Sequence, residues 1–337
     1  MKAETPPLVN KATPAAWLST PAVRAILALA LVFACGLIFN ANGAFFKFGT
    51  HRDALRQISV YGLLACGMTL VVISGGIDLA VGSILGLVAV FFSLATLHWG
   101  WSPLLAVPAS LLLGAAAGTV SGVLTSLGKF QPFIATLAVM VTARGLAKQI
   151  SGNEKISTAI AGPDGSMKYV DVPPIFRAID SRVLGENVAV VSLIFLAVFA
   201  VTWVLLTRHR WGRELYAIGG NEEAARLSGV PVDRAKIAAY VLSGLFAAVA
   251  GLCQAAQEQQ GDPEGGAGYE LTAIAIVVIG GTSLMGGRGG IGLTLVGMLT
   301  IGYLEKILSI NAVPESTRLI LTGGIVALAV LAQRSRK

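Results

Sequence analysis

The sequence predicts an all-α integral membrane protein, and three observations lead to this fold class. Hydrophobic residues make up 55% of the 337 residues and charged residues only 13%, about half of the roughly 25% that soluble domains carry. The apolar residues fall into runs of about 17 to 24, the length of helix that crosses a hydrocarbon core of about 30 Å. The 40 glycines would weaken soluble helices, but membrane spans use them for close packing and local helix breaks.

About ten apolar segments are long enough to cross a membrane. We expect about ten transmembrane helices, arranged as two inverted repeats plus extra helices, in a single transmembrane domain over residues 21–333. The limits of the helices around 73–86 and 271–291 stay open. The expected spans are 21–40, 54–73, 80–98, 103–125, 131–149, 188–207, 237–256, 271–285, 291–308 and 317–333.

Basic residues predict the orientation of this bundle. An even number of spans places both termini on one side, and basic residues favour the cytoplasmic side. Lys2, Lys11 and Arg24 precede the first span, and Arg334, Arg336 and Lys337 follow the last. The connection that holds Lys47 and Arg52 argues the other way. We expect a multi-pass membrane protein with both termini cytoplasmic, and we interpret the net charge of +7 as this inside bias and not as a nucleic-acid site.

This orientation assigns the polar segments. Residues 1–20 and 334–337 are expected cytoplasmic tails, and 150–187 an expected periplasmic loop. Residues 208–236 form the expected cytoplasmic connection, which contains the most polar stretch of the second half, GGNEEAARLSGVPVDRAK. A loop as long as 150–187 is usually functional or disordered, and its length alone does not decide between the two.

The polar stretch predicts a short helix. Asn221 can cap its first turn, and Glu222 and Glu223 complement the positive helix end. Gly229, followed by Pro231, is expected to stop the helix after about two turns. Such a short helix is marginal in water by itself. Either it lies on the membrane surface as a plain connection, or another protein packs on it.

The same stretch carries a family resemblance. Glu223, Ala224, Ala225 and Gly229 spell EAAxxxG, which resembles the cytoplasmic loop signature of permease subunits of bacterial ATP-binding-cassette (ABC) importers. In that family the short helix docks in a cleft of the ATPase subunit and transmits its closure. The resemblance implies that this chain couples to an ATPase through Asn221, Glu222, Glu223, Ala224, Ala225, Arg226 and Gly229.

Other stretches resemble the ribose/xylose-type sugar permeases, in the superfamily of branched-chain-amino-acid and ribose permeases. These are ISGGIDLAVGSILG at 73–86, KFQPFIATLAVMVTARGLA at 129–147 and GYELTAIAIVVIGGTSLMGGRGG at 268–290. Thr272 stands where relatives commonly carry an acidic residue. The resemblance implies a permease subunit of the bacterial inner membrane, for a monosaccharide such as ribose or xylose. It also implies a cytoplasmic ABC ATPase that holds ATP and Mg, a periplasmic sugar-binding protein, and a second permease copy or paralogue; it leaves the sugar open.

Asp78 is the main charged group expected at membrane depth, where burial of a charge at a helix centre costs at least about 2.5 to 3.5 kcal/mol. It either lines a polar pathway or caps the next helix through amides around Val81, and the sequence shows no evident buried partner for it. The expected translocation pathway includes Gly75, Gly76, Asp78, Gly280, Gly281 and Thr282.

No catalytic motif has its required context. GRGGIG at 287–292 matches a dinucleotide pattern but lies between membrane-length apolar runs, and GVLTSLGKF at 122–130 has Phe130 where a phosphate loop needs Ser or Thr. Three histidines without metal-ligand spacing predict no metal site. We therefore expect no enzyme and no cofactor bound by this chain. The alternative to an ABC permease is an ion-coupled secondary transporter of a small polar solute, which would need buried ionisable groups.

Overall fold

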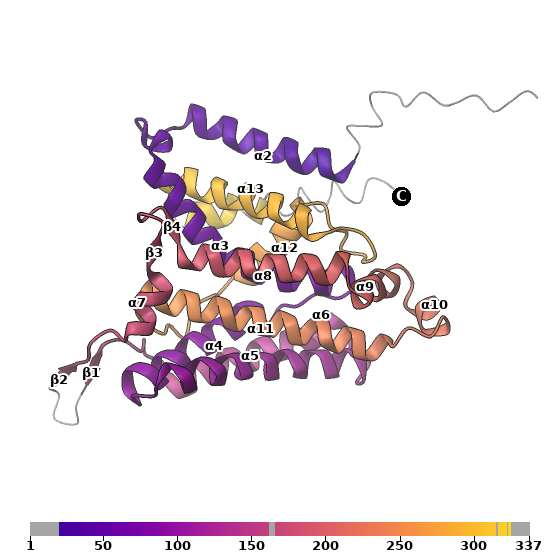
Figure 1. Ribbon diagram of the computed structural model, residues 1–337, viewed down its shortest axis with the longest axis horizontal. Helices are drawn as coiled ribbons and strands as arrows, with labels where there is room; N and C mark the ends of the chain where they lie inside the picture. Colours follow the sequence, from indigo (N-terminus) through magenta and orange to yellow (C-terminus); the bar gives the residue numbers. More distant parts are fainter. Residues whose placement is uncertain (1–19, 162–165, 315, 322, 325–337) are drawn as a thin grey trace, which may run out of the picture.

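Long helices run side by side to form a single bundle in the computed structural model, which describes residues 20–161, 166–314, 316–321 and 323–324 (Figure 1). The long helices are α2 (Pro21–Ile38), α3 (Phe48–Ile73), α4 (Val81–Ser93), α5 (Pro103–Ser126), α6 (Pro132–Ser151), α8 (Val190–Thr207), α11 (Val232–Glu258) and α13 (Ile291–Ile310). The short helices are α7 (Pro174–Asp180), α9 (Arg210–Gly220), α10 (Glu222–Leu227) and α12 (Tyr269–Ile279). A 3-10 turn, Ala44–Phe46, precedes α3, and a π-helical turn, Leu94–His98, continues α4.

Eight of the described helices are long and apolar enough to cross a membrane, if α4 is counted with its π-helical turn. They correspond to eight of the expected spans. The prediction of a span at 271–285 is wrong, because α12 has 11 residues and ends at Ile279. Gly280 and Gly281 follow, and Gly281 has a left-handed φ of +98° that ends the helix. The expected span 317–333 and the tails 1–20 and 334–337 lie largely outside the described residues.

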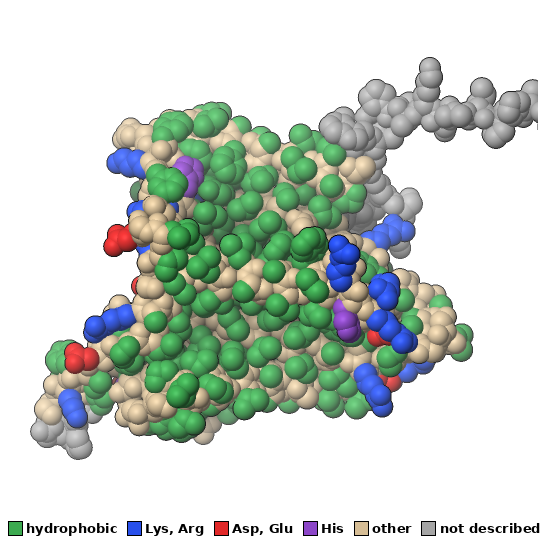
Figure 2. Space-filling model, in the orientation of Figure 1, with side chains coloured by type: hydrophobic (Ala, Val, Ile, Leu, Met, Phe, Trp, Pro, Cys, Tyr) green, Lys and Arg blue, Asp and Glu red, His purple; other side chains and the backbone are tan. Residues whose placement is uncertain are grey.

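The two ends of the bundle differ (Figure 1). At one end lie α9 and α10. At the other lie α7 and two small antiparallel sheets, formed by β1 (Ala159–Ala161) with β2 (Met167–Tyr169) and by β3 (Arg182–Val183) with β4 (Val188–Ala189). Figure 2 shows apolar side chains over the middle of the bundle and Lys and Arg side chains gathered at the α9–α10 end. This apolar band between polar ends is typical of a membrane protein.

Helix α11 lies at the centre of the bundle and packs on α3, α4 and α5. Three glycines on one face of α5 allow a close approach. A Cβ on Gly114, Gly118 or Gly122 would collide with α11 at Gly244 and Ala248, at Tyr240, or at Ile237, respectively. These glycines are four residues apart, and together they form the face of α5 on which α11 packs closely.

Two pairs of consecutive helices are joined by short non-helical segments inside the bundle, which we call breaks. Residues 74–80 connect α3 to α4, and residues 259–268 connect α11 to α12. Helices α3 and α11 run in opposite directions, since Gly67 packs on Ser243 while Arg56 contacts Gln257 further along. The starts of α4 and α12 meet, because Gly82 packs on the Gly266 carbonyl group and the Glu270 side chain. Broken helices that meet inside a bundle recur in transporters built from inverted repeats.

Candidate coupling site

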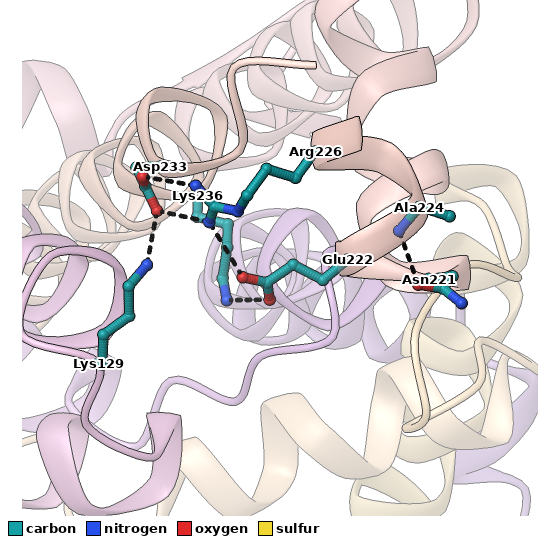
Figure 3. Close-up of polar contacts among 7 residues, drawn as sticks. All are labelled: Lys129, Asn221, Glu222, Ala224, Arg226, Asp233 and Lys236. Atoms are coloured by element: carbon teal, nitrogen blue, oxygen red, sulfur yellow. Dashed lines mark hydrogen bonds and ion pairs between the residues drawn. The ribbon is translucent and has the colours of Figure 1, made fainter. Parts of the chain in front are cut away.

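Helix α10 forms as the sequence predicts. The Oδ1 atom of Asn221 accepts a hydrogen bond of 2.9 Å from the Ala224 amide (Figure 3), which confirms the expected cap. The helix ends at Leu227, and Gly229 follows with a left-handed φ of +81°. The amide of Val230 donates to the Ala225 carbonyl over 3.0 Å, so the turn at Gly229 satisfies the helix end.

Ion pairs fix α10 to the bundle (Figure 3). The Glu222 carboxylate accepts from Lys236 over 3.0 Å, and Arg226 bonds both carboxylate oxygens of Asp233 at 3.0 and 3.1 Å. Asp233 also accepts from Lys129 over 3.0 Å, and Lys129 lies in the turn between α5 and α6. The network therefore connects α10 to the first turns of α11 and to the α5–α6 turn.

Sequence reasoning assigned no role in coupling to Lys129, Asp233 or Lys236. One signal was available for two of them: Asp233 and Lys236, like Arg234, are charged residues at the start of a helix whose middle is apolar. The Lys236 side chain is only 10% exposed, and a buried cation needs a partner. Partial burial tends to raise the pKa of the Glu222 carboxyl, but the hydrogen bonds and charges of Lys236 and Arg226 outweigh it and hold that pKa below its ordinary value.

The other face of α10 is exposed. Ala225 is buried at 5% exposure and holds the helix against the bundle, whereas Glu223 and Ala224 are exposed and Leu227 is 84% exposed. Sequence reasoning did not select Leu227, although it is an apolar residue one turn after Glu223 in a polar stretch. A shallow groove of about 330 Å³ lies beside this face, between α9 and the Ser228–Val230 turn. These exposed residues form a surface on which another protein can pack.

Helix α9 connects this site to the glycine-rich segments. Gly219 packs on the Ile73 carbonyl at the end of α3 and on Gly287, and the Gly287 amide donates to Ile73 over 2.9 Å. The Tyr216 hydroxyl donates to the Gly289 carbonyl over 3.0 Å. Residues 73–75 and 286–289, which are far apart in sequence, therefore meet against α9.

The expected pathway residues lie in the two segments 74–80 and 280–290. Gly75 packs against Gly219 and Gly286, and Gly76 lies against the Tyr240 hydroxyl. In the second segment Gly280 packs on the Leu293 carbonyl and Gly281 on Pro21, and the Thr282 hydroxyl accepts a hydrogen bond from the Gly290 amide over 3.4 Å. These are tight backbone contacts, and a role in translocation stays a prediction.

Asp78 is completely buried and has two partners. One carboxylate oxygen accepts from the Ala80 amide over 3.0 Å, and the other accepts from the Ser243 hydroxyl over 2.7 Å. The sequence shows no evident buried partner for Asp78, and the structure provides one in Ser243. The contact with the Ala80 amide resembles the expected cap of α4. The donor is Ala80, the residue directly before Val81. Asp78 thus links the 74–80 break to the central helix α11.

The sequence of the chain is similar to those of known permeases. The model of the family described as "Branched-chain amino acid transport system / permease component" matches residues 52–330. The chain is 38% identical to the ribose import permease protein RbsC of Escherichia coli (strain K12) over 312 residues, which cover 92% of this chain and 93% of that protein. It is 39% identical to RbsC of Bacillus subtilis (strain 168) over 284 residues, 84% of each chain.

A xylose permease is also similar. The chain is 33% identical to the xylose transport system permease protein XylH of Escherichia coli (strain K12) over 355 aligned positions, which cover 91% of this chain and 89% of that protein. No solved structure matches the chain. Among the described residues, no group of three or more His, Cys, Asp or Glu side chains is placed to hold a metal ion.

Proposed function

The chain belongs to the family of branched-chain amino acid transport system permease components, and we propose that it is the membrane-spanning permease subunit of an ABC importer for a monosaccharide. The observation that carries this proposal is its similarity, along about nine-tenths of its length, to permeases named for ribose and xylose. A pentose of the ribose or xylose kind is therefore the first substrate to test. The exposed face of α10 supports the same function, because an importer permease needs a surface for a separate ATPase.

In the proposed assembly the chain contacts three kinds of partner subunit. A cytoplasmic ABC ATPase, which holds ATP and Mg, packs on Glu223, Ala224 and Leu227 and on the neighbouring groove. A second permease copy or paralogue completes the membrane part, and a periplasmic sugar-binding protein delivers the sugar. In this assembly both termini, α9 and α10 are cytoplasmic, whereas the loop 150–187 faces the periplasm. The gathering of Lys and Arg side chains at the α9–α10 end (Figure 2) supports this orientation.

Two routes lead from α10 into the bundle. Glu222 and Arg226 hold Lys236 and Asp233 of α11, so a displacement of α10 acts on α11 directly. Further along α11, Ser243 donates to Asp78 and so reaches the 74–80 break. The second route runs through α9, where Gly219 packs on the end of α3 and on Gly287. ATP-driven closure of the ATPases would thereby shift both segments and open the path to each side in turn.

Purification with partners tests the proposal. The tagged chain is extracted from its native membranes in mild detergent, and the proteins that co-purify are identified by mass spectrometry. We expect an ATPase with intact phosphate-loop motifs, lost in a Glu223→Lys or Gly229→Val variant that still inserts in the membrane. Recovery of the permease without any ATPase, together with sugar transport in liposomes without ATP, would support an ion-coupled carrier instead. Normal uptake by the Gly229→Val variant would also contradict the proposed coupling.

A further inference from the structure

A polar cavity lies between α3, α11, α12 and α13. Its volume is about 320 Å³, within the range of about 300 to 1,000 Å³ for small-molecule sites. Its position is at the end of the bundle that carries α7, opposite α9 and α10 (Figure 1), since the Arg56 side chain that lines it forms an ion pair with Asp180 of α7. The cavity does not include any of the expected pathway residues. We call it the Gln254 cavity, and its principal lining side chains are Arg56, Tyr61, Gln254, Glu258, Tyr269 and Glu305.

Gln254 is the residue in the cavity lining whose hydrogen bonding is incomplete. Its side chain is buried, with the residue 7% exposed, and its Nε2 atom donates to Glu258 over 2.8 Å. Its Oε1 atom is buried and has no hydrogen-bond partner among the described residues. Buried polar atoms are nearly always paired. An unpaired acceptor atom at a cavity wall can accept a hydrogen bond from a hydroxyl group of a bound molecule.

The walls combine flat aromatic and flat polar groups. The rings of Tyr61 and Tyr269 lie edge to face, with centroids 4.7 Å apart, and together they offer an apolar surface with hydroxyl groups at its margin. The Glu258 carboxylate accepts from Gln254, and the Glu305 carboxylate is a further acceptor group in the lining. The Gln257 amide donates over 3.4 Å to the Arg56 carbonyl. A sugar presents the complementary surface, because its C–H groups contact aromatic rings while its hydroxyl groups donate and accept.

The charges of the cavity nearly balance. The lining contains three cationic residues, Arg56, Lys306 and Arg318, and two acidic residues, Glu258 and Glu305. Asp180 neutralises Arg56 from outside the cavity, which leaves two of each sign. A net ion would therefore gain little here, whereas a neutral molecule with several hydroxyl groups can use every donor and acceptor.

We infer that the Gln254 cavity is a sugar-binding position inside the permease, in which Gln254 Oε1 accepts a hydrogen bond from a hydroxyl group of a neutral monosaccharide. The inference rests on the proposed function, and it locates the sugar where the chain itself would receive it. We expect the sugar to bind weakly here, because a site on a permeation path must also release its solute.

Two variants of the full chain test this position in the assembled importer. Gln254→Met removes the amide at nearly constant volume, and Ser309→Trp places a ring at the exposed edge of the cavity lining, where it does not disturb the core. The matched controls are Gln260→Met, which does not line the cavity, and Ser309→Ala. Sugar contact is measured by saturation-transfer NMR on the permease in nanodiscs with D-ribose, D-xylose or leucine as the probe. Uptake is measured in proteoliposomes with the ATPase and the binding protein.

We expect a ribose or xylose signal for the wild type and both controls, and its loss in Gln254→Met and Ser309→Trp. We also expect the KM for uptake to rise about three- to tenfold in Gln254→Met, the effect of one lost hydrogen bond, with an unchanged midpoint of thermal unfolding. Normal signal and uptake in both test variants would overturn the inference while the proposed function stands. Absence of sugar uptake by the wild-type assembly, or a signal with leucine alone, would overturn the proposed function and the inference together.

Discussion

The Cα atom of Gly219, in α9, packs against the carbonyl oxygen of Ile73, the last residue of α3. That oxygen also accepts a hydrogen bond of 2.9 Å from the Gly287 amide. Three segments that are distant in sequence thus converge on one carbonyl group, next to the proposed ATPase surface. No side chain larger than hydrogen fits at position 219, because a Cβ there would overlap Ile73 and Gly287.

Gly219→Ala is therefore expected to destabilise the protein by about 1 to 3 kcal/mol, the usual effect of overpacking, and to reduce uptake. Its matched control is Gly220→Ala, because nothing lies within 4 Å of a Cβ at that neighbouring helical position. Alanine should be neutral or slightly stabilising there. Thermal unfolding in detergent and sugar uptake compare the two variants. Equal midpoints and equal uptake for both would contradict the close contact of Gly219 with Ile73.

The turn after α10 provides a second test. Gly229 has a φ of +81°, but nothing lies within 4 Å of a Cβ at this position. The constraint is thus backbone conformation and not space. Asparagine tolerates left-handed φ values better than other residues, whereas β-branched valine does not.

We therefore expect Gly229→Asn to keep most of the coupled uptake and Gly229→Val to lose it, with more ATP hydrolysed per sugar transported. The two side chains are close in size, so a difference between them reports the turn itself. The measurement is the ratio of uptake to ATP hydrolysis in proteoliposomes. If the valine variant transports as efficiently as the wild type, α10 does not require this turn.

The sequence was sufficient to predict α10 because its determinants are local. Asn221 caps the helix and Gly229 ends the turn after it, and both act within one or two turns of chain. By contrast, the partner of Glu222 is Lys236 on the next helix, and that of Asp78 is Ser243, 165 positions away. Such pairs depend on tertiary packing, which no local pattern encodes.

The error at 271–285 has a similar cause. The apolar run of α12 continues into Gly280–Gly281 and Leu284, so an average of hydropathy extends across the break. The left-handed φ of Gly281 is what stops the helix. The Gln254 cavity was not predicted either, because four helices contribute to it and its polar residues are scattered from Arg56 to Arg318.

The ion pair of Glu222 with Lys236 predicts a dependence on pH. The pKa of Glu222 is lowered on folding from its ordinary value of 4.5. The pair therefore contributes its full stabilisation above about pH 4.5 and loses it as the pH falls through the lowered value. The stabilisation is small, about 1 kcal/mol or less, because Glu222 is 44% exposed and salt screens the pair.

We expect α10 to stay docked at neutral pH and to loosen only in acid, and Glu222→Gln to be looser throughout with little further change on acidification. A spin label at Leu227→Cys reports this motion without disturbing the buried face, since Leu227 is 84% exposed. Cys35 is replaced by serine to prevent labelling there, because it is not fully buried. Loosening of the wild type between about pH 7 and pH 6 would contradict the assignment to Glu222.

Asp78 distinguishes the importer from an ion-coupled carrier. In Asp78→Asn, the amide oxygen can still accept from the Ala80 amide, and the NH₂ group can donate to the Ser243 hydroxyl, so both contacts survive without a charge. Asp78→Leu instead leaves two buried polar groups unpaired, at a cost of about 1 to 3 kcal/mol each. We therefore expect the leucine variant to be much less stable and the asparagine variant to fold normally.

Transport by the asparagine variant then decides between the two functions. If ATP drives transport and Asp78 only links the 74–80 break to α11, Asp78→Asn should retain most of the ATP-dependent uptake. If Asp78 were the coupling group of a carrier driven by protons or sodium ions, loss of its negative charge would abolish coupled uptake although the fold is preserved. Uptake is measured in proteoliposomes that contain either ATP and the ATPase or an imposed ion gradient alone. Gradient-driven uptake by the wild type that disappears in Asp78→Asn would support the carrier, because only that mechanism requires the ionised carboxylate.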